Sequence, residues 1–386
     1  MHILPVSFAL FTYVGFWRPV DWPRNSLKYW LYNIYTVFMV FMLCLYGLCG
    51  IGDAYADQNV NTFIEKFTLT ISVLAVCVKV INIIIRRESV ISLVNMLLEK
   101  NCLPRDSEEK LIQQSFDDRA RKITIYCEFL NEITVIIAII MQQIQSAKTH
   151  TLDVWTPYDC SSSFAFWFTV IHQSVALLVC ANSSVAHETL ISCLMLQICA
   201  QLEILGHRIK HLPKMFEEVE KDSNFTENWK IQEKRIVREL IEYHLYIYSF
   251  ASRVNSVFTT MIMLQFSIST IVLCLTVYRM SKSSIASIEF IWGLSYLASM
   301  FIQIFLYCWF GNEVMLKSTQ VGDMFYEMDW VSLGHNFVVK LLPIVMSRAT
   351  KPILMRSGYI ILLSAESFTS ILKTSYSAFN VLQNSS

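Results

Sequence analysis

The chain alternates between seven apolar stretches and polar connections. Each stretch is about 20 residues long, and a helix of that length crosses the hydrocarbon core of a bilayer. The stretches run approximately over residues 30–51, 64–85, 123–144, 164–196, 256–277, 287–310 and 357–380. The pattern therefore predicts an all-α polytopic membrane protein with seven transmembrane helices, forming a single domain over residues 1–386.

Helical periodicity continues outside two of these stretches. Apolar residues recur at intervals of three and four from Met195 to Ile209, and again from Val237 to Val254. This spacing is typical of amphipathic helices, so the fourth and fifth spans are expected to project beyond the membrane and to pack their stripes together. The alternative is a solvated hairpin without a partner. In the sixth connection, Pro343 and Pro352 predict a helix over 312–342, then a break before the last span.

The basic residues are distributed asymmetrically about the predicted spans. Of the 28 Lys and Arg residues outside the apolar stretches, 25 lie on the side that carries the N-terminus. Cytoplasmic flanks of membrane proteins collect Lys and Arg, so the N-terminus is expected in the cytoplasm and the C-terminus outside the cell. This orientation is the reverse of that of a G-protein-coupled receptor.

Composition excludes several classes of function. The chain is 54% hydrophobic and 16% charged, with a mean hydropathy of +0.44, so a soluble core of this length could not hide its apolar surface. The net charge of zero gives no electrostatic support for nucleic-acid binding. Cys-x-x-Cys pairs, phosphate-binding glycine loops and nucleophile-elbow motifs are absent from the sequence, which indicates no enzyme, metal site or cofactor.

The C-terminal hundred residues resemble a known family. The matching positions are Gln265, Phe266, Tyr278, Phe305, Tyr307, Cys308, Phe310, Gly311, Asn312, Glu313, Ser318, Val321, Tyr326, Trp330, Arg348, Lys351, Pro352, Leu354, Gly358, Leu363, Ser364, Phe368, Ile371, Lys373, Ser375, Tyr376, Ser377, Phe379, Val381 and Leu382. Together they resemble the C-terminal signature of insect odorant receptors, whose topology agrees with the one that the charges predict. Two departures are Ala378, where an aromatic is common, and Arg356, where the family has a small residue.

The resemblance implies a function and its partners. An insect odorant receptor binds a small volatile odorant and forms a non-selective cation channel as a heterotetramer with the odorant receptor coreceptor. It lies among lipids in the plasma membrane of olfactory sensory neurons. An anchor domain, here approximately 197–255 and 311–352, holds the subunits together on the cytosolic side and includes Tyr326 and Trp330. The last span lines the pore.

Site residues follow from the resemblance and from helical spacing. Ser377, Val381 and Ser385 recur every four residues on the last span and would line the pore, with Val381 as the gate. The alternative is that this face packs on a neighbouring helix. The resemblance places the odorant pocket in the outer half of spans two, three, four and six, where the candidates are mainly apolar or aromatic. They are Phe67, Ile71, Leu74, Ile137, Met141, Phe168, Ile171, His172, Val175, Phe290, Leu294 and Tyr296.

Rival functions have weaker support. Glu128 and Glu132 lie one turn apart in the third span, but pairing with basic residues explains them better than catalysis. A G-protein-coupled receptor would need an external N-terminus. A gustatory receptor of the same superfamily would carry a terminal motif that Thr374, Tyr376 and Gln383 match only with the wrong spacing. A transporter would be expected to contain repeated halves, and no two halves of this sequence resemble each other.

Overall fold

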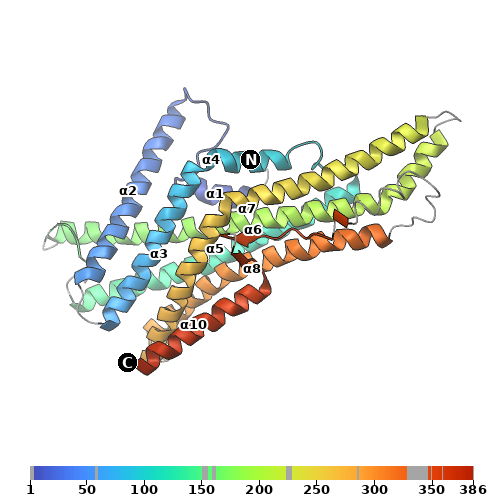
Figure 1. Cartoon of the computed structure of the whole chain (residues 1–386). Coiled ribbons are helices and arrows are strands. Elements are labelled where there is room, and N and C mark those ends of the chain that lie inside the picture. Colours follow the sequence, from blue (N-terminus) through green and yellow to red (C-terminus); the bar gives the residue numbers. More distant parts are fainter. Residues whose placement is uncertain are drawn as a thin grey trace.

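The protein is almost entirely helical (Figure 1). The computed structural model describes residues 4–56, 60–149, 155–158, 162–222, 228–284, 287–327, 347–348, 350–358 and 360–385. The elements are α1 (Pro5–Tyr13), α2 (Leu27–Ala56), α3 (Val60–Ile85), α4 (Arg87–Leu97), α5 (Ser107–Thr149), α6 (Ser163–Asp222), α7 (Asn228–Lys282), α8 (Ile288–Glu327), β1 (Arg356–Ser357), β2 (Ile361–Leu362) and α10 (Ala365–Ser385).

Six of the described helices are long and apolar enough to cross a membrane, namely α2, α3, α5, α6, α7 and α8. They contain the first six predicted spans, and the protein is a multi-pass membrane protein. The seventh predicted span corresponds to α10, which is 21 residues long but is not among the six helices that are apolar enough to cross a membrane. A polar helix of membrane-spanning length is stable only where protein or water covers its polar face.

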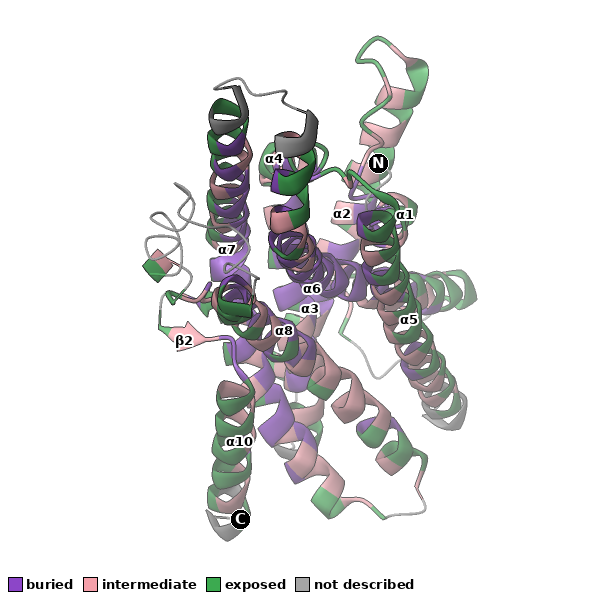
Figure 2. Cartoon of the chain, turned by 90° about the vertical axis from the view of Figure 1, so that its right-hand side faces the viewer, coloured by how far each residue is buried: buried purple, intermediate pink, exposed green. Residues whose placement is uncertain are grey.

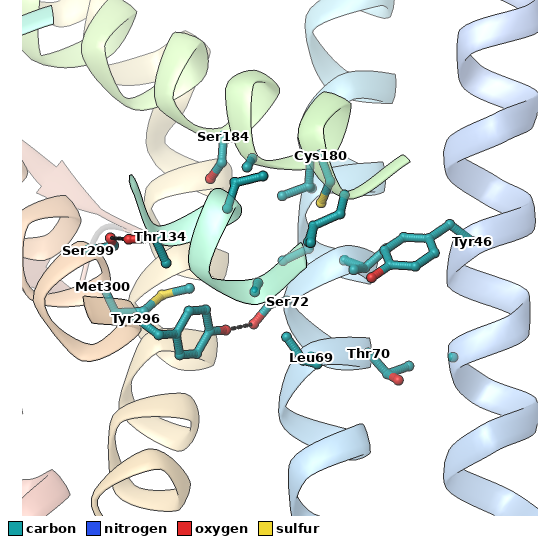
Figure 3. Close-up of a pocket in the computed structure, with 18 of the residues that line it drawn as sticks. Tyr46, Leu69, Thr70, Ser72, Thr134, Cys180, Ser184, Tyr296, Ser299 and Met300 are labelled. Carbon is teal, nitrogen blue, oxygen red and sulfur yellow. Dashed lines mark hydrogen bonds between the residues drawn. The ribbon is translucent and has the colours of Figure 1, made fainter. Parts of the chain in front are cut away.

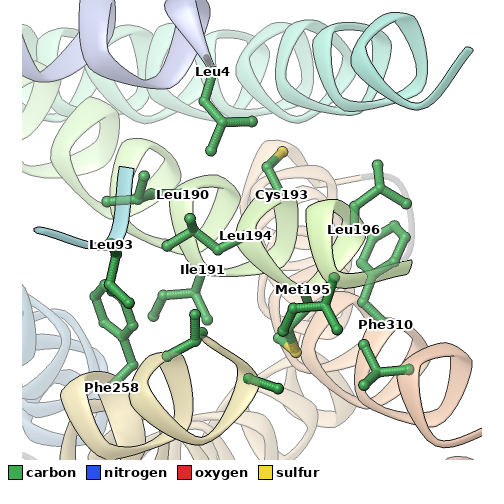
Figure 4. Packing of buried hydrophobic residues seen from close by; sticks show 14 of the residues in the cluster. Leu4, Leu93, Leu190, Ile191, Cys193, Leu194, Met195, Leu196, Phe258 and Phe310 are labelled. Carbon is green, nitrogen blue, oxygen red and sulfur yellow. The ribbon is translucent and has the colours of Figure 1, made fainter. Parts of the chain in front are cut away.

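Helix α6 forms the centre of the bundle. Every residue from 182 to 202 is buried, because α1, α2, α3, α5, α7 and α8 all contact this helix. In Figure 2, α6 lies at the centre of the bundle and much of it is purple. In Figure 4, Leu190, Ile191 and Leu194 point toward residues of the surrounding helices, including Leu93 and Phe258. A helix that is buried on all sides fixes the positions of its neighbours.

Helices α6 and α7 are much longer than a bilayer is thick. They contain 60 and 55 residues, which correspond to about 90 and 80 Å at the helical rise per residue. The apolar periods that continue past the fourth span and before the fifth lie within these unbroken helices. Pro213 lies inside α6 near its far end, without ending the helix.

The seventh predicted span, 357–380, begins too early. Strands β1 and β2 form a short antiparallel hairpin in which Arg356 pairs with Leu362 and Ser357 with Ile361. Gly358 has a φ of +57° in its turn, a conformation that favours glycine and that a helix cannot contain. The Ser364 side chain then accepts a hydrogen bond from the Ser367 backbone N–H at 3.2 Å, which caps the start of α10.

The helix expected over 312–342 is not a separate element. Helix α8 runs unbroken from Ile288 through Gly311 to Glu327, and positions 328–342 lie outside the described residues. Gly311 instead allows a close contact, because a Cβ atom at this position would lie 2.7 Å from the Leu363 carbonyl oxygen. The segment after the hairpin thus packs directly against α8.

Candidate ligand-binding cavity

A cavity of about 330 Å³ lies inside the helix bundle. Each of the six membrane-crossing helices contributes to its wall, through residues that include Tyr46, Ser72, Thr134, Cys180, Gln265 and Tyr296. In Figure 3, the labelled side chains surround this space from the flanking helices. Its volume is in the range of small-molecule sites in proteins.

Side-chain hydrogen bonds join neighbouring helices at the cavity wall. The Ser72 and Tyr296 hydroxyls lie 2.6 Å apart and join α3 to α8 (Figure 3). Thr134 on α5 lies 2.7 Å from the Ser295 hydroxyl and 3.2 Å from the Ser299 hydroxyl on α8. Since no bulk water reaches the bilayer core, such groups are stable only when they bond to one another or to a ligand. The wall therefore offers hydroxyl groups that can exchange a protein partner for a ligand partner.

An ion pair lies at the wall of the cavity. Lys79 on α3 and Glu188 on α6 are joined by an Nζ to Oε1 distance of 2.7 Å, and their side chains are only 2% and 3% exposed. The Ser184 hydroxyl donates to the same carboxylate oxygen at 2.9 Å, and both Lys79 and Ser184 line the cavity. Ionisable residues at membrane depth are costly unless they are paired, so this pair fixes α3 against α6.

A second ion pair lies toward the α7–α8 connection. The Arg279 guanidinium contacts the Glu65 carboxylate at 2.6 Å and lies 4.8 Å from the centre of the Trp292 ring. Glu65 and Trp292 both line the cavity. Because Arg279 is in the last turn of α7, its charge also compensates the partial negative charge of the helix C-terminus.

The chain matches the family model described as 7tm Odorant receptor over residues 59–376. It belongs to the insect odorant receptor family. Among curated proteins, it is 25% identical over 288 residues to Odorant receptor 46a, isoform A, of Drosophila melanogaster, covering 72% of this chain and 71% of that one. It is 24% identical over 285 residues to Odorant receptor Or1 of Anopheles gambiae, covering 68% of this chain and 66% of that receptor.

The fold of this receptor has a solved counterpart. The structure of the insect olfactory receptor OR5 from Machilis hrabei in complex with eugenol matches with a TM-score of 0.84 and 18% identity, covering 99% of this chain and 98% of that chain. A second structure of the insect olfactory receptor OR5 from Machilis hrabei matches with a TM-score of 0.83 and 18% identity, covering 97% of this chain and 96% of that chain. The likeness at this identity establishes the shared helical fold.

Two of the twelve predicted pocket residues, Met141 and Tyr296, line the cavity. Others point away from it, since their side chains are exposed on the outer surface of the bundle: Leu74, Phe168, Ile171, Val175 and Leu294. Four are partly buried but are not among the lining residues: Phe67, Ile71, Ile137 and Phe290. His172 is 5% exposed and likewise does not line the cavity.

The predicted pocket residues that do not line this cavity share one feature. On α6 the predicted positions follow the face of Phe168, Ile171 and Val175, whereas the cavity is lined by Gln173 and Leu177 on the opposite face. Successive residues of a helix are rotated by about 100°, so the two-residue offset from Ile171 to Gln173, and from Val175 to Leu177, reverses the face. In a membrane protein the lipid-facing and cavity-facing sides are both apolar, and the period alone cannot separate them.

Sequence reasoning missed the polar part of the wall. Gln142, Gln173, Gln265 and Gln303 line the cavity, and Gln265 donates to the Gln303 side-chain oxygen at 2.8 Å. The signal that could have found this region is the presence of Lys79 and Glu188 within two different predicted spans, because ionisable residues inside a membrane usually face a cavity or each other.

The predicted pore residues lie on α10. This helix contacts α7 and α8, and its other side is largely uncovered in the single chain (Figure 2). Ser377 is exposed and Val381 is 68% exposed, while Ser385 is the last residue of the helix. Phe368, one turn into α10, is packed against Phe301 and Phe305 of α8.

The ends of α5, α6, α7 and α8 farthest from the cavity are joined by ion pairs and by a cation–π contact. Arg208 contacts Glu109 through two donors at 2.8 and 2.9 Å and lies 4.4 Å from the Tyr243 ring centre. Arg119 contacts Glu313 at 2.8 and 3.1 Å. Of the two predicted anchor residues, Tyr326 is 66% exposed at the end of α8, and Trp330 lies outside the described residues.

Proposed function

We propose that this receptor is the odorant-binding subunit of a ligand-gated cation channel, formed as a heterotetramer with the odorant receptor coreceptor in the plasma membrane of olfactory sensory neurons. The odorant occupies the cavity that α2, α3, α5, α6, α7 and α8 line. The observation that carries this proposal is a cavity of about 330 Å³ within the bundle whose wall mixes apolar side chains with paired hydroxyls.

The wall selects the chemical class of the odorant. Tyr46, Leu69 and Met300 provide apolar contact area, while the Ser72 and Tyr296 hydroxyls provide one donor and one acceptor within 2.6 Å of each other. A volatile molecule with a hydroxyl, carbonyl or ether oxygen can form a hydrogen bond with this pair and bury its hydrocarbon part against the apolar side chains. A pure hydrocarbon leaves the pair intact but gains no polar contact.

Conduction is assigned to α10. Its side away from α7 and α8 presents Ser377 and Val381 outside the packed core, and a polar helix at membrane depth needs a neighbouring subunit or water to cover that side. An oligomer in which this side faces a central axis satisfies the requirement. Val381 would then supply the apolar constriction and Ser377 a polar lining.

Paired substitutions test the cavity. Leu177 lines it, whereas Val175 on the same helix is 42% exposed on the outer surface. With the coreceptor coexpressed, Leu177→Trp is expected to raise the odorant concentration for half-maximal current at least tenfold, because the larger ring fills part of the space, whereas Val175→Trp leaves it unchanged. Equal effects of the two variants, with equal surface expression, would refute the placement.

Cysteine accessibility tests the pore. Val381→Cys is expected to lose current when a charged thiol reagent is applied from outside during odorant stimulation. Leu372→Cys is the matched control on the same helix, because Leu372 packs against the buried core. If the reagent reduces the current only in Leu372→Cys, or leaves the current of both variants unchanged, the assignment of α10 to the pore is refuted.

Orientation is tested with a tag after Ser386. The excess of basic residues on the N-terminal side predicts a cytoplasmic N-terminus and an extracellular C-terminus. Antibody labelling of intact cells is therefore expected without permeabilisation and is expected to increase with the coreceptor. Labelling only after permeabilisation, with independent proof of surface expression, would contradict the channel and favour a metabotropic receptor.

A further inference from the structure

Two histidines and a carboxylate meet where α5 begins beside the extended part of α6. Glu108 is in the first turn of α5, while His207 and His211 are one helical turn apart on α6. One possible ligand atom from each of the three residues lies within 4.8 Å of the other two, and the two imidazole ring centres are 4.2 Å apart. Histidines at positions i and i+4 of a helix share a face, a spacing that metal-binding helices use.

Hydrogen bonds fix which imidazole nitrogens are free to bind a ligand. The Nδ1 atom of His211 lies 3.1 Å from the His207 carbonyl oxygen, and a carbonyl only accepts, so Nδ1 carries the proton and Nε2 keeps its lone pair. The Nε2 atom of His207 lies 3.0 Å from an Asp106 carboxylate oxygen, which in the same way leaves Nδ1 with the lone pair. A carboxylate or carbonyl behind each ligating imidazole is typical of metal sites.

The free nitrogen of His207 faces an anion. Its Nδ1 atom is 3.3 Å from the Glu108 carboxylate oxygen, and two lone pairs at this distance repel each other unless a cation lies between them. A second proton on His207 would remove the repulsion, and so would a metal ion. Ligands about 2.1 Å from a tetrahedral Zn²⁺ are about 3.4 Å apart, which agrees with this separation.

The neighbouring carboxylate of Glu109 has other partners. It accepts two hydrogen bonds from Arg208 at 2.8 and 2.9 Å and one from the Arg105 backbone N–H at 2.7 Å. Its lone pairs are therefore largely used, whereas the Glu108 side chain is 67% exposed and can turn toward an ion. Glu108 is therefore a better candidate ligand than Glu109 to accompany His207 and His211.

We propose that Glu108, His207 and His211 bind a divalent transition-metal ion, with Zn²⁺ as the best fit, and leave one coordination position open to solvent. Two imidazoles and one carboxylate suit Zn²⁺ and Cu²⁺ and disfavour Mg²⁺ and Ca²⁺. A bound ion joins the start of α5 to α6. Both helices continue to the cavity, so the site can couple metal concentration to the arrangement of these two helices.

Metal binding is measured on the full-length receptor, purified in detergent with an affinity tag that contains no histidines. Titration with Co²⁺ is expected to produce saturable visible absorption bands at one ion per chain, which Zn²⁺ displaces. Added Zn²⁺ is also expected to raise the thermal unfolding midpoint. Neither readout depends on odorant or current, so a failure here is distinct from a failure of the proposed channel function.

Four variants decide the assignment. His207→Gln and His211→Gln are expected to abolish saturable binding. Asp106→Asn is expected to weaken binding about 10- to 100-fold, while its side-chain oxygen still caps α5 through the Glu109 backbone N–H, as Asp106 does at 2.7 Å. Glu242→Gln, on an exposed carboxylate of α7, is the matched control and is expected to bind like the wild type.

Folding is checked separately from binding. If either histidine variant loses its monodisperse elution, Glu108→Gln replaces it, because that side chain is mostly exposed and the change conserves its shape. The proposal is overturned if the wild type shows no saturable binding, or if binding survives unchanged in His207→Gln, His211→Gln and Glu108→Gln, which would indicate an adventitious ion only.

Discussion

The ion pair between Lys79 and Glu188 gives the sharpest test of how the cavity wall is stabilised. Lys79→Met removes the ammonium and leaves the Glu188 carboxylate, whose side chain is 3% exposed, with the Ser184 hydroxyl at 2.9 Å. Glu188→Met removes the carboxylate and leaves the Lys79 ammonium 3.3 Å from the same hydroxyl. Each single variant therefore leaves one buried charge uncompensated.

The size of the effect follows from this burial. Removing one partner of a buried ion pair costs about 3 to 5 kcal/mol, whereas replacing both with apolar residues of similar volume is often neutral. The double variant Lys79→Met with Glu188→Met is therefore expected to regain most of the stability that either single variant loses. For a chain of 386 residues, a loss of this size lowers the thermal unfolding midpoint by at least about 4 °C.

The assay is a thermal series on detergent-solubilised receptor, read by size-exclusion chromatography with fluorescence detection. Wild type, both single variants and the double variant form a complete cycle. Val175→Ala, on the outer surface of α6, is the control for an unrelated change in a span. Single variants within about 1 °C of wild type, or losses that simply add in the double variant, would refute the pairing.

Two further outcomes follow from close packing and from burial outside the membrane. Gly311→Ala is expected to lower the unfolding midpoint, because its Cβ would lie 2.7 Å from the Leu363 carbonyl oxygen. Gly206→Ala is the milder control, because a Cβ at Gly206 meets the flexible end of the Met324 side chain. Equal shifts of the unfolding midpoint in the two variants would contradict this reasoning. Burial lowers the pKa of His244 from 6.5 to about 4, so stability is full above pH 6.5 and falls toward pH 4, by about 2 kcal/mol at pH 5. His244→Phe is expected to reduce the drop in unfolding midpoint between pH 7.5 and 5, and an unchanged drop would assign it to other groups.

The long helices could be predicted from the sequence because their signal is local. The apolar period of Val237, Leu240 and Val254 lies on the buried side of α7, and a period of this kind predicts a helix wherever it occurs. Leu245, in the same stripe, is 49% exposed, which shows that the period locates a face only approximately. Which helices surround α6 depends on contacts between distant segments and has no comparable local signal.

The hairpin and the start of α10 had weaker signals. A strand of two residues is too short to show an alternating pattern, and the apolar span that the sequence predicts over 357–380 includes residues 357–362. The hairpin is held by contacts that are distant in sequence: the Asn255 side chain accepts from the Arg356 backbone N–H at 2.8 Å, and the Thr259 hydroxyl accepts from the Gly358 N–H at 2.8 Å. Such contacts override local helix preference.

The unbroken length of α6 has a mechanical consequence. Ser184 at the cavity and Arg208 at the far ion pair belong to one continuous helix, and the 24 residues between them span about 36 Å. A rigid rod of that length converts a tilt of about 5° at the cavity into a displacement of about 3 Å at the other end. A small molecule that tilted α6 slightly at the cavity would therefore move the opposite end of the helix by about the length of a hydrogen bond.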